Sequence, residues 1–343
     1  MTPNSQTRRA VLSSIASTST LIIAPLLPKD AYAADPDGVL IPGVAAPFRN
    51  LIVEGATPWK PTSLVTNLGK SRILAKELSP LNPSLVPFAS DNELYYDTFL
   101  FGAWQATATL KRKVFPYGTN YLPSPSLYEG SPRNRAEQPG DSTTYEMHYF
   151  SPNTDAGKIG SKSKIIADRA FNAKSLSSSY NQFSQVDEVQ WDYKKDPTRL
   201  TIIFSTLAED MRPVGKKRGE IYISARKTES AVDSNTGETV FCTSERLRSV
   251  VLVPGNAVAS DTETITEFRL VNDSDGNHVK ATSRIAVYLT PNPNSREGVM
   301  WQDVNGKAVA FFDYDIDLRR MVKEDSDGQK ACVYSPSGAI QCA

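Results

Sequence analysis

The stretch GAWQATATLK, residues 102–111, decides the fold class of this chain. Its apolar side chains recur at every second position, at Trp104, Ala106, Ala108 and Leu110. A period of two places alternate side chains on opposite faces of an extended strand, so one face is apolar and the other polar. The stretch therefore predicts a β-strand with one buried face.

Nine further segments have a similar strand-like pattern. They lie at residues 144–150, 163–172, 186–193, 199–206, 219–227, 239–253, 262–271, 279–290 and 307–321. Helical periodicity is almost absent among them, and turn sequences such as 233–237 (DSNTG) separate neighbouring segments. About ten short antiparallel strands bury their apolar faces best when the sheet closes on itself. We therefore predict an all-β protein built on an antiparallel barrel.

The composition divides the chain into four parts. Residues 34–90 are rich in Pro, Leu, Ser and Asn without a sustained period, which predicts an extended, partly ordered arm. The only regular element expected there is a short helix at 71–78. The barrel domain is predicted over 91–322, and a C-terminal tail follows at 323–343.

Residues 1–33 have the pattern of an export signal. Arg8-Arg9 precede a mildly apolar run at 10–27, and the small-residue site Ala-Tyr-Ala stands at 31–33. This arrangement is typical of a twin-arginine signal with cleavage after the small-residue site. The apolar run is diluted by Ser and Thr and falls short of the roughly 20 apolar residues that a spanning helix needs. We therefore expect a mature protein that does not span the membrane.

The charge of the chain is balanced, with 38 Lys and Arg residues and 38 Asp and Glu residues. Removal of residues 1–33 would leave the mature chain slightly acidic. Binding to nucleic-acid phosphates needs a net basic face. Nucleic acid is therefore not expected as a partner.

The chain lacks the sequence patterns of common enzymes and metal sites. Its two histidines, His148 and His278, have no neighbouring Cys, His or carboxylate at metal-ligand spacing. The motifs of a nucleophile elbow, a zinc protease and a phosphate loop are also missing. We therefore predict no catalytic residues, no metal and no cofactor.

Two acidic segments could be taken for cation sites. Residues 272–277 (NDSDGN) alternate as calcium-loop ligands do, but the glycine is misplaced and no bidentate Glu follows, so a hairpin turn is favoured. Asp313, Asp315 and Asp317 alternate with apolar residues in a strand-like segment. We interpret these three as the solvated outer face of a closing strand.

The start of the first strand resembles lipocalin-type barrels, which open with Gly-x-Trp. Here the motif is Gly102-Ala103-Trp104. In that superfamily the Trp closes one end of the barrel and stacks under an Arg from a late strand, supported by cation–π attraction. The resemblance implies a lipocalin-like (calycin-type) β-barrel, with Arg284 as the candidate partner of Trp104.

A longer series of motifs resembles one plant, algal and cyanobacterial family of thylakoid lumen proteins whose domain has no assigned function. The motifs are Gly102-x-Trp104, Phe115-Pro116-x-Gly118, residues 167–172 (ADRAFN), Trp191, and Pro197-x-Arg199-Leu200. The resemblance implies a photosynthetic context, the chloroplast thylakoid lumen as location, and no catalytic residues. Gly102, Trp104, Asp168 and Asn172 would be its structural motif residues.

The twin-arginine signal agrees with the location that this resemblance implies. Plastid members of the family usually carry a transit peptide ahead of the lumen signal, whereas seven residues precede Arg8 here. The precursor is therefore expected to be truncated or to start differently. An oxidising lumen would also permit a disulfide between Cys332 and Cys342, with Cys242 as a buried thiol.

Asp168 and Arg169 form an adjacent acid and base in a predicted strand. Successive strand residues point to opposite faces, so a structural role is favoured over a joint ligand contact: Arg169 pairing across the sheet, or Asp168 fixing a turn. If the barrel holds a pocket, Arg169, Arg284 and Tyr288 are the polar residues expected nearest to it. Arg284 and Tyr288 share a strand face by the period of two.

These patterns support two functions from different classes, and for a third, an enzyme built on a lipocalin-like barrel, the sequence offers no set of catalytic residues. The first is a non-catalytic barrel that binds a small apolar ligand such as a pigment, lipid or quinone-like molecule. The second is an auxiliary or assembly factor of a photosystem or another thylakoid membrane complex, acting through its surface loops and arm. The barrel lining distinguishes them, because small apolar side chains leave room for a ligand whereas large aromatic side chains fill the interior. We rank ligand binding slightly higher.

Overall fold

The structure is a computed structural model of the 343-residue chain. It describes residues 51–55, 59, 61, 64–82, 93–131, 134–153, 159, 163–180, 184–207, 212–253, 256–272, 276–293, 295–325 and 328–342. The predicted export signal at 1–33 and the first part of the predicted arm, at 34–50, lie outside the described residues.

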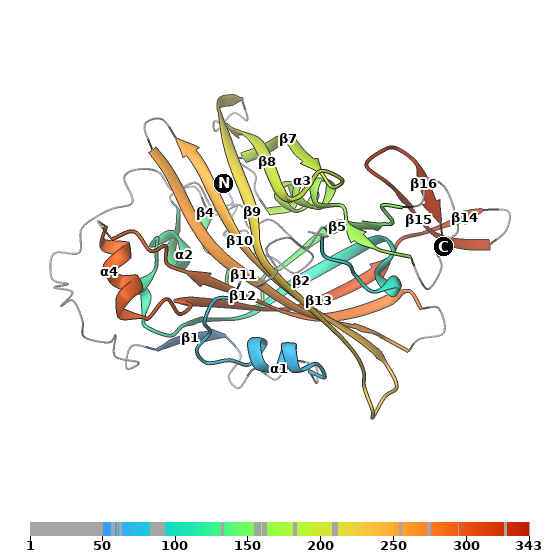
Figure 1. Ribbon diagram of the computed structural model, residues 1–343, viewed down its shortest axis with the longest axis horizontal. Coiled ribbons are helices and arrows are strands. Elements are labelled where there is room, and N and C mark those ends of the chain that lie inside the picture. Colours follow the sequence, from blue (N-terminus) through green and yellow to red (C-terminus); the bar gives the residue numbers. More distant parts are fainter. Residues whose placement is uncertain are drawn as a thin grey trace, which may run out of the picture.

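Most of the described chain forms one curled antiparallel sheet, in the order β6-β5-β2-β13-β12-β11-β10-β9-β8-β7, with β1 paired to β2 (Figure 1). The strands are β1 (Ile52–Gly55), β2 (Gly102–Phe115), β5 (Ser142–Phe150), β6 (Ile166–Ala167), β7 (Ser184–Asp192), β8 (Asp196–Leu207), β9 (Pro213–Val232), β10 (Thr239–Val253), β11 (Asn256–Leu270), β12 (His278–Tyr288) and β13 (Ala310–Arg320). The all-β antiparallel prediction is confirmed, and the half-barrel curl is compatible with a lipocalin-like fold.

The remaining elements are short. They are α1 (Asn67–Ile73), η3 (Thr98–Leu100), η4 (Thr119–Tyr121), α2 (Ser126–Glu129), β3 (Gly130–Ser131), β4 (Asn134–Arg135), α3 (Arg169–Tyr180), α4 (Arg296–Asp303), β14 (Val322–Asp325), β15 (Gly328–Tyr334) and β16 (Ile340–Cys342). The last three strands form a separate small sheet. The segment expected as a C-terminal tail is therefore largely ordered.

Helix α3 lies between the two ends of the curled sheet. It packs against β5 near one end and against β7 at the other. Among the described residues, no strand pairing joins β6 to β7. Helix α3 thus bridges a gap that a fully closed barrel would fill with hydrogen bonds between strands.

The strand predicted over residues 163–172 is wrong in its second half. Only Ile166–Ala167 pairs within the large sheet as a named strand, and the chain enters α3 at Arg169. Asp168 explains the change, because its Oδ1 accepts a hydrogen bond from the backbone N–H of Phe171 at 3.0 Å. An Asp side chain in this position satisfies a free N–H of the first helical turn and so favours a helix.

The short helix predicted at 71–78 is found at Asn67–Ile73 instead. Thr66 sets its start, since the Oγ1 atom accepts a hydrogen bond from the N–H of Gly69 at 2.9 Å. Two carboxylates of the sheet hold the same end: Glu267 accepts from the N–H of Thr66 at 3.0 Å, and Glu229 accepts from that of Leu68 at 2.8 Å. The arm is thus anchored on the sheet.

The arm covers the convex outer face of the sheet, on the side opposite to α3 (Figure 1). Its apolar side chains form one cluster with outward-facing residues of the strands: Trp59, Leu64, Leu68, Ile73, Leu78, Val114, Cys242, Ile265, Ala286, Tyr288, Ala308 and Phe311. The central strands are therefore buried on both faces, unlike a sheet with one solvated side.

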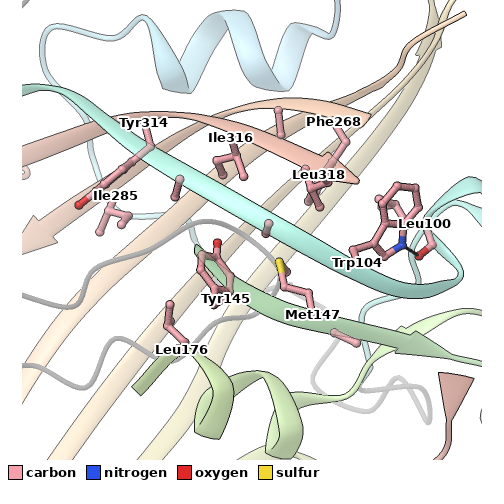
Figure 2. Close-up of a cluster of buried hydrophobic side chains, with 14 of the residues drawn as sticks. Leu100, Trp104, Tyr145, Met147, Leu176, Phe268, Ile285, Tyr314, Ile316 and Leu318 are labelled. Carbon is pink, nitrogen blue, oxygen red and sulfur yellow. Dashed lines mark hydrogen bonds between the residues drawn. The ribbon is translucent and has the colours of Figure 1, made fainter. Parts of the chain in front are cut away.

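The concave inner face carries the largest apolar cluster, part of which is drawn in Figure 2. Trp104 lies there with no exposed surface, and its Nε1 donates a hydrogen bond to the carbonyl oxygen of Leu100 at 2.7 Å. Buried Trp side chains usually need such a partner for their N–H group. The alternation that predicted the first strand thus places Trp104 in the interior, as expected.

Candidate functional site

The strand register arranges the inner face in rows across the sheet. One row, Phe241–Phe268–Ala281–Ile316, is apolar and aromatic. The next row, Thr243–Thr266–Ser283–Tyr314, is mostly hydroxyl-bearing, and the following row contains Glu245 and Thr264. That row continues to Ile285 and Phe312, so the inner face becomes polar on β10 and β11 and stays apolar on β12 and β13.

A charged triad stands at the polar part of the inner face. The Nη2 atom of Arg169 lies 2.6 Å from Oε1 of Glu93 and 2.9 Å from Oε1 of Glu245. All three side chains are at least 94% buried, with exposed fractions of 1%, 6% and 2%. Burial alone would lower the pKa of Arg169, but Glu245 and Glu93 raise it above the ordinary value. The triad therefore keeps a cation between two carboxylates inside the protein.

Several buried oxygen atoms of this triad and of the inner face have no hydrogen-bond partner among the described residues. They are the hydroxyls of Tyr145, Tyr149, Thr262 and Thr264, and Oε2 of Glu93. The register places all four hydroxyl-bearing residues on the inner face, opposite inward residues of neighbouring strands. Buried polar groups in native proteins are nearly always satisfied, so such a group calls for water or a ligand.

The tyrosines of the inner face are held in their neutral form. Burial is the largest cause that raises the pKa of Tyr149 well above its ordinary value, with a smaller contribution from Tyr96. Burial also raises the pKa of Tyr145, and the charge of Glu137 adds to this effect. Both hydroxyls therefore remain hydrogen-bond donors at any physiological pH.

Another carboxylate of the interior, that of Glu137, already has a tyrosine partner. The hydroxyl of Tyr314 donates to its Oε2 atom at 2.8 Å. Lys113, also on the inner face, pairs with Glu54 at 2.8 Å. The interior can thus hold polar groups in an apolar setting, which suits a ligand with both kinds of surface.

The structure does not bring together the three residues expected nearest a pocket. Arg169 faces the interior from α3, whereas Arg284 and Tyr288 share the outer face of β12 beneath the arm. Arg284 and Tyr288 lie on the same face of β12, as the period of two predicted. The period does not tell whether that face is the inner or the outer face of the sheet. The hydroxyl of Tyr288 donates to Oε2 of Glu263 at 3.0 Å.

Arg284 is not the partner of Trp104. The guanidinium of Arg320 lies 4.4 Å from the centre of the Trp104 ring, and that of Arg284 lies 4.4 Å from the ring of Phe311. The predicted stacking of an Arg from a late strand on this Trp is therefore found, with Arg320 from β13 in place of Arg284 from β12. Arg320 takes this place because the register of β13 puts it directly opposite Trp104.

The interpretation of Asp313 as a solvated residue is wrong. Its side chain is fully buried and accepts from Nε of Arg284 at 2.7 Å and from Nε of Arg112 at 2.6 Å. Asp315 and Asp317 are partly buried and pair with Lys111 and His278, respectively. The arm packs on part of the outer face of the sheet, and the alternation of residues along one strand cannot predict this packing.

Sequence reasoning missed Glu93, Glu245 and Arg320. Glu245 had a usable signal, because it occupies an inward position two residues before the buried Leu247 and four after the buried Phe241. A charge at such a position needs a buried partner. Arg169 supplies it from the first residue of α3, and not from a neighbouring strand as the predicted pairing across the sheet required.

The other predicted residues have structural placements. Asn172 accepts from the N–H of His148 at 2.7 Å and donates to its carbonyl oxygen at 3.2 Å, which joins α3 to β5. Gly102 has a φ of 113°, a backbone conformation that favours glycine. A disulfide joins Cys332 and Cys342, and Cys242 is a buried free thiol.

Among the described residues, no group of three or more His, Cys, Asp or Glu side chains is placed to hold a metal ion. In the same part of the chain, no helix is long and apolar enough to cross a membrane.

A family model described as a domain of unknown function (DUF6816) matches residues 89–322. The chain belongs to this family. The DUF6816 region extends through the charged triad, α3 and the strands from β2 to β13, and it leaves out α1 and strands β15 and β16. Comparisons with curated proteins and with solved structures gave no match.

Proposed function

We propose that this protein is a non-catalytic binding protein that holds a small, largely apolar molecule on the concave face of its sheet. The observation that carries the proposal is the group of buried oxygen atoms at Tyr145, Tyr149, Thr262, Thr264 and Glu93 without partners among the described residues. A bound molecule with hydrogen-bonding groups would satisfy them.

The chemistry of the interior indicates what kind of molecule fits. Neutral Tyr145 and Tyr149 offer hydroxyl donors, which suit carbonyl or hydroxyl acceptors. The small side chains of Ala106 and Ala108 suit an apolar body, whereas the large side chains of Phe241 and Phe268 on the same face favour a filled interior. A pigment, lipid or quinone-like compound has this combination of a polar end and an apolar body.

We also propose the chloroplast thylakoid lumen as the location of this protein, where such molecules are found in the adjoining membrane. The Arg8-Arg9 signal and the family resemblance of the motifs support this location. The disulfide between Cys332 and Cys342 supports an oxidising compartment.

Native mass spectrometry of the mature protein, purified from its own membrane compartment, tests the proposal. We expect a bound small molecule that solvent extraction and absorbance identify. Tyr149→Phe removes one inward hydroxyl and keeps the ring, so this variant should retain less of the molecule. Tyr222→Phe, at a half-exposed side chain of β9, is the matched control and should bind normally.

A protein that purifies empty and binds no extracted thylakoid pigment, lipid or quinone contradicts the proposal. If Tyr149→Phe retained as much of the bound molecule as the wild type does, the proposal that the Tyr149 hydroxyl binds the polar end of that molecule would be contradicted. An empty barrel that instead associates with a purified photosystem complex would support the auxiliary or assembly role.

A further inference from the structure

Part of the outer face of the large sheet carries exposed arginines. The register places Tyr222 of β9 opposite both Arg199 of β8 and Arg248 of β10, so the three form one row across the sheet. Four residues away along β9, Arg218 lies opposite Leu252 of β10. Directly paired residues, and every second residue along a strand, share a face of an antiparallel sheet. These five side chains therefore lie on one surface, which we call the arginine face.

The arginine face points away from the interior. Leu200 and Ile221 alternate with its residues along β8 and β9, and they are buried in one cluster with Ala173 of α3. Helix α1 packs nearer the other end of β9, where the N–H of Leu68 donates to Glu229 (Figure 1). The five side chains of the arginine face are between 39% and 51% exposed. The face is therefore accessible to a partner.

Buried carboxylates hold the guanidinium groups of this face in place. Glu220, which is 8% exposed, accepts from Nε of Arg199 at 3.0 Å and from Nη2 of Arg218 at 2.6 Å. Asp261, which is 1% exposed, accepts from Nε and Nη2 of Arg248, each at 2.7 Å. A guanidinium held in this way loses less conformational freedom on binding than a free long side chain does. The arginine face is therefore preorganised for contact.

Positive charge dominates the exposed part of this face. Asp261 also pairs with a second arginine, Arg246, at 3.2 Å, so four arginines surround two carboxylates that are no more than 8% exposed. Among the described residues of these rows, the exposed carboxylate is that of Glu188 on β7, opposite Ile203. Each guanidinium has five N–H donors, more than one carboxylate can accept, so donors remain for a partner. An acidic surface is the complementary one.

We propose that the arginine face binds an acidic surface of a partner protein. Carboxylates of the partner pair with Arg199, Arg218 and Arg248, and an apolar side chain packs on Tyr222 and Leu252. Arg and Tyr are enriched in protein interfaces and Lys is depleted, which matches a face of three Arg, one Tyr and one Leu. A lipid surface is recognised by clusters of Lys and Arg without this aromatic and apolar part. The observations therefore favour a protein over a membrane.

Fluorescence anisotropy with the full mature chain tests this proposal. The probe is a short fluorescein-labelled peptide that repeats Glu-Glu-Leu, and the control probe has Lys in place of Glu. We expect the acidic probe to bind, and the basic probe to bind at least about tenfold more weakly. Added salt should weaken binding of the acidic probe, because the ion pairs form at the surface. No binding of the acidic probe up to about 1 mM overturns the proposal.

A double variant, Arg218→Gln with Arg248→Gln, removes two charges of the arginine face. Arg199 and Arg246 remain to pair with the two buried carboxylates, so each carboxylate keeps one cation. The variant should bind the acidic probe at least about fivefold more weakly, because two exposed ion pairs with the probe are lost. Circular dichroism shows whether its sheet is folded.

Two further variants complete the test. The control double variant, Lys174→Gln with Arg319→Gln, removes two exposed charges of α3 and β13 and should bind like the wild type. Leu252→Ser removes the exposed apolar side chain and leaves all charges in place. It should weaken binding about twofold to fivefold, because less apolar surface is buried against the probe.

Unchanged binding by a folded Arg218→Gln and Arg248→Gln variant overturns the proposal. If that variant does not fold, unchanged binding by Leu252→Ser overturns it instead. A control double variant that is weakened as strongly also overturns it, because the probe would then respond to net charge alone. Binding of the chain to vesicles of phosphatidylglycerol and phosphatidylcholine, without binding of the acidic probe, overturns it in favour of a membrane. These outcomes concern the outer face and are independent of the ligand proposed for the interior.

Discussion

Replacement of Arg284 by Met should strongly destabilise the protein. Its guanidinium and the carboxylate of Asp313 are 1% and 0% exposed and form two bonds, Nε to Oδ1 at 2.7 Å and Nη2 to Oδ2 at 2.9 Å. Nη1 also donates to the carbonyl oxygen of Ala75 in the arm at 2.5 Å. Among the described residues, Arg112 is the cation that would still pair with the buried Asp313 in this variant.

The cost of one uncompensated buried charge sets the upper limit of the magnitude, because Arg112 also pairs with Asp313, at 2.6 Å. Removal of one partner from a buried ion pair costs about 3–5 kcal/mol of unfolding free energy. For a domain of this size, such a loss lowers the melting temperature by roughly 6–20 °C. Urea unfolding followed by tryptophan fluorescence measures the free energy, and calorimetry measures the melting temperature.

A double-mutant cycle separates the ion pair from general damage to the core. The variant that combines Arg284→Met with Asp313→Leu removes both charges and should lose at least about 2 kcal/mol less than the sum of the two single variants. Arg319→Met, in an exposed pair with Asp317, is the control and should change stability by less than about 1 kcal/mol. A loss below about 1 kcal/mol for Arg284→Met, or additive losses in the cycle, would refute the reasoning.

Three further predictions concern other parts of the fold. Arg320→Met should lower the unfolding free energy by about 2–3 kcal/mol in the same urea assay, because the partly buried backbone carbonyls of Phe99 and Phe101 lose their charged donor. The pKa values of the buried Tyr145 and Tyr149 are raised in the folded state, so their contribution to the unfolding free energy should be complete below about pH 10 and should be lost at higher pH. Absorbance titration at 295 nm should show that these two tyrosines ionise only when the protein unfolds. Cys332→Ser should lower the unfolding free energy by up to about 3 kcal/mol, because the disulfide to Cys342 is lost. Amide hydrogen exchange should then rise locally at Ser151, because the side chain of Gln341, next to Cys342, binds the backbone of Ser151.

The arrangement of the arm explains why several charged residues differ from expectation. A strand with alternating polar residues normally has one solvated face. In this protein, the segment from Leu64 to Leu78 packs on that face, and Arg72 pairs with the buried Glu263 in a contact between the arm and the sheet. Outer-face charges therefore have to find buried partners, as Arg284 and Asp313 do.

The sequence alone determined the strands and the alternation of their faces, because both depend on the local period of side chains. The period in residues 102–111 correctly placed Trp104 inside, and the close spacing of Cys332 and Cys342 suggested their disulfide. Local capping also carried a signal at Asp168, which was overlooked where α3 begins. These features need only neighbours along the chain.

Only the tertiary structure decided which side chains meet across the sheet. Arg320 rather than Arg284 lies over Trp104, and Arg169 reaches Glu245 from a helix that bridges the sheet ends. Such pairs depend on strand order, register and the position of the arm, and residues far apart in the sequence set all three. A period of two assigns residues to the same face, but the packing of the whole chain decides whether that face lies against the interior, the arm or solvent.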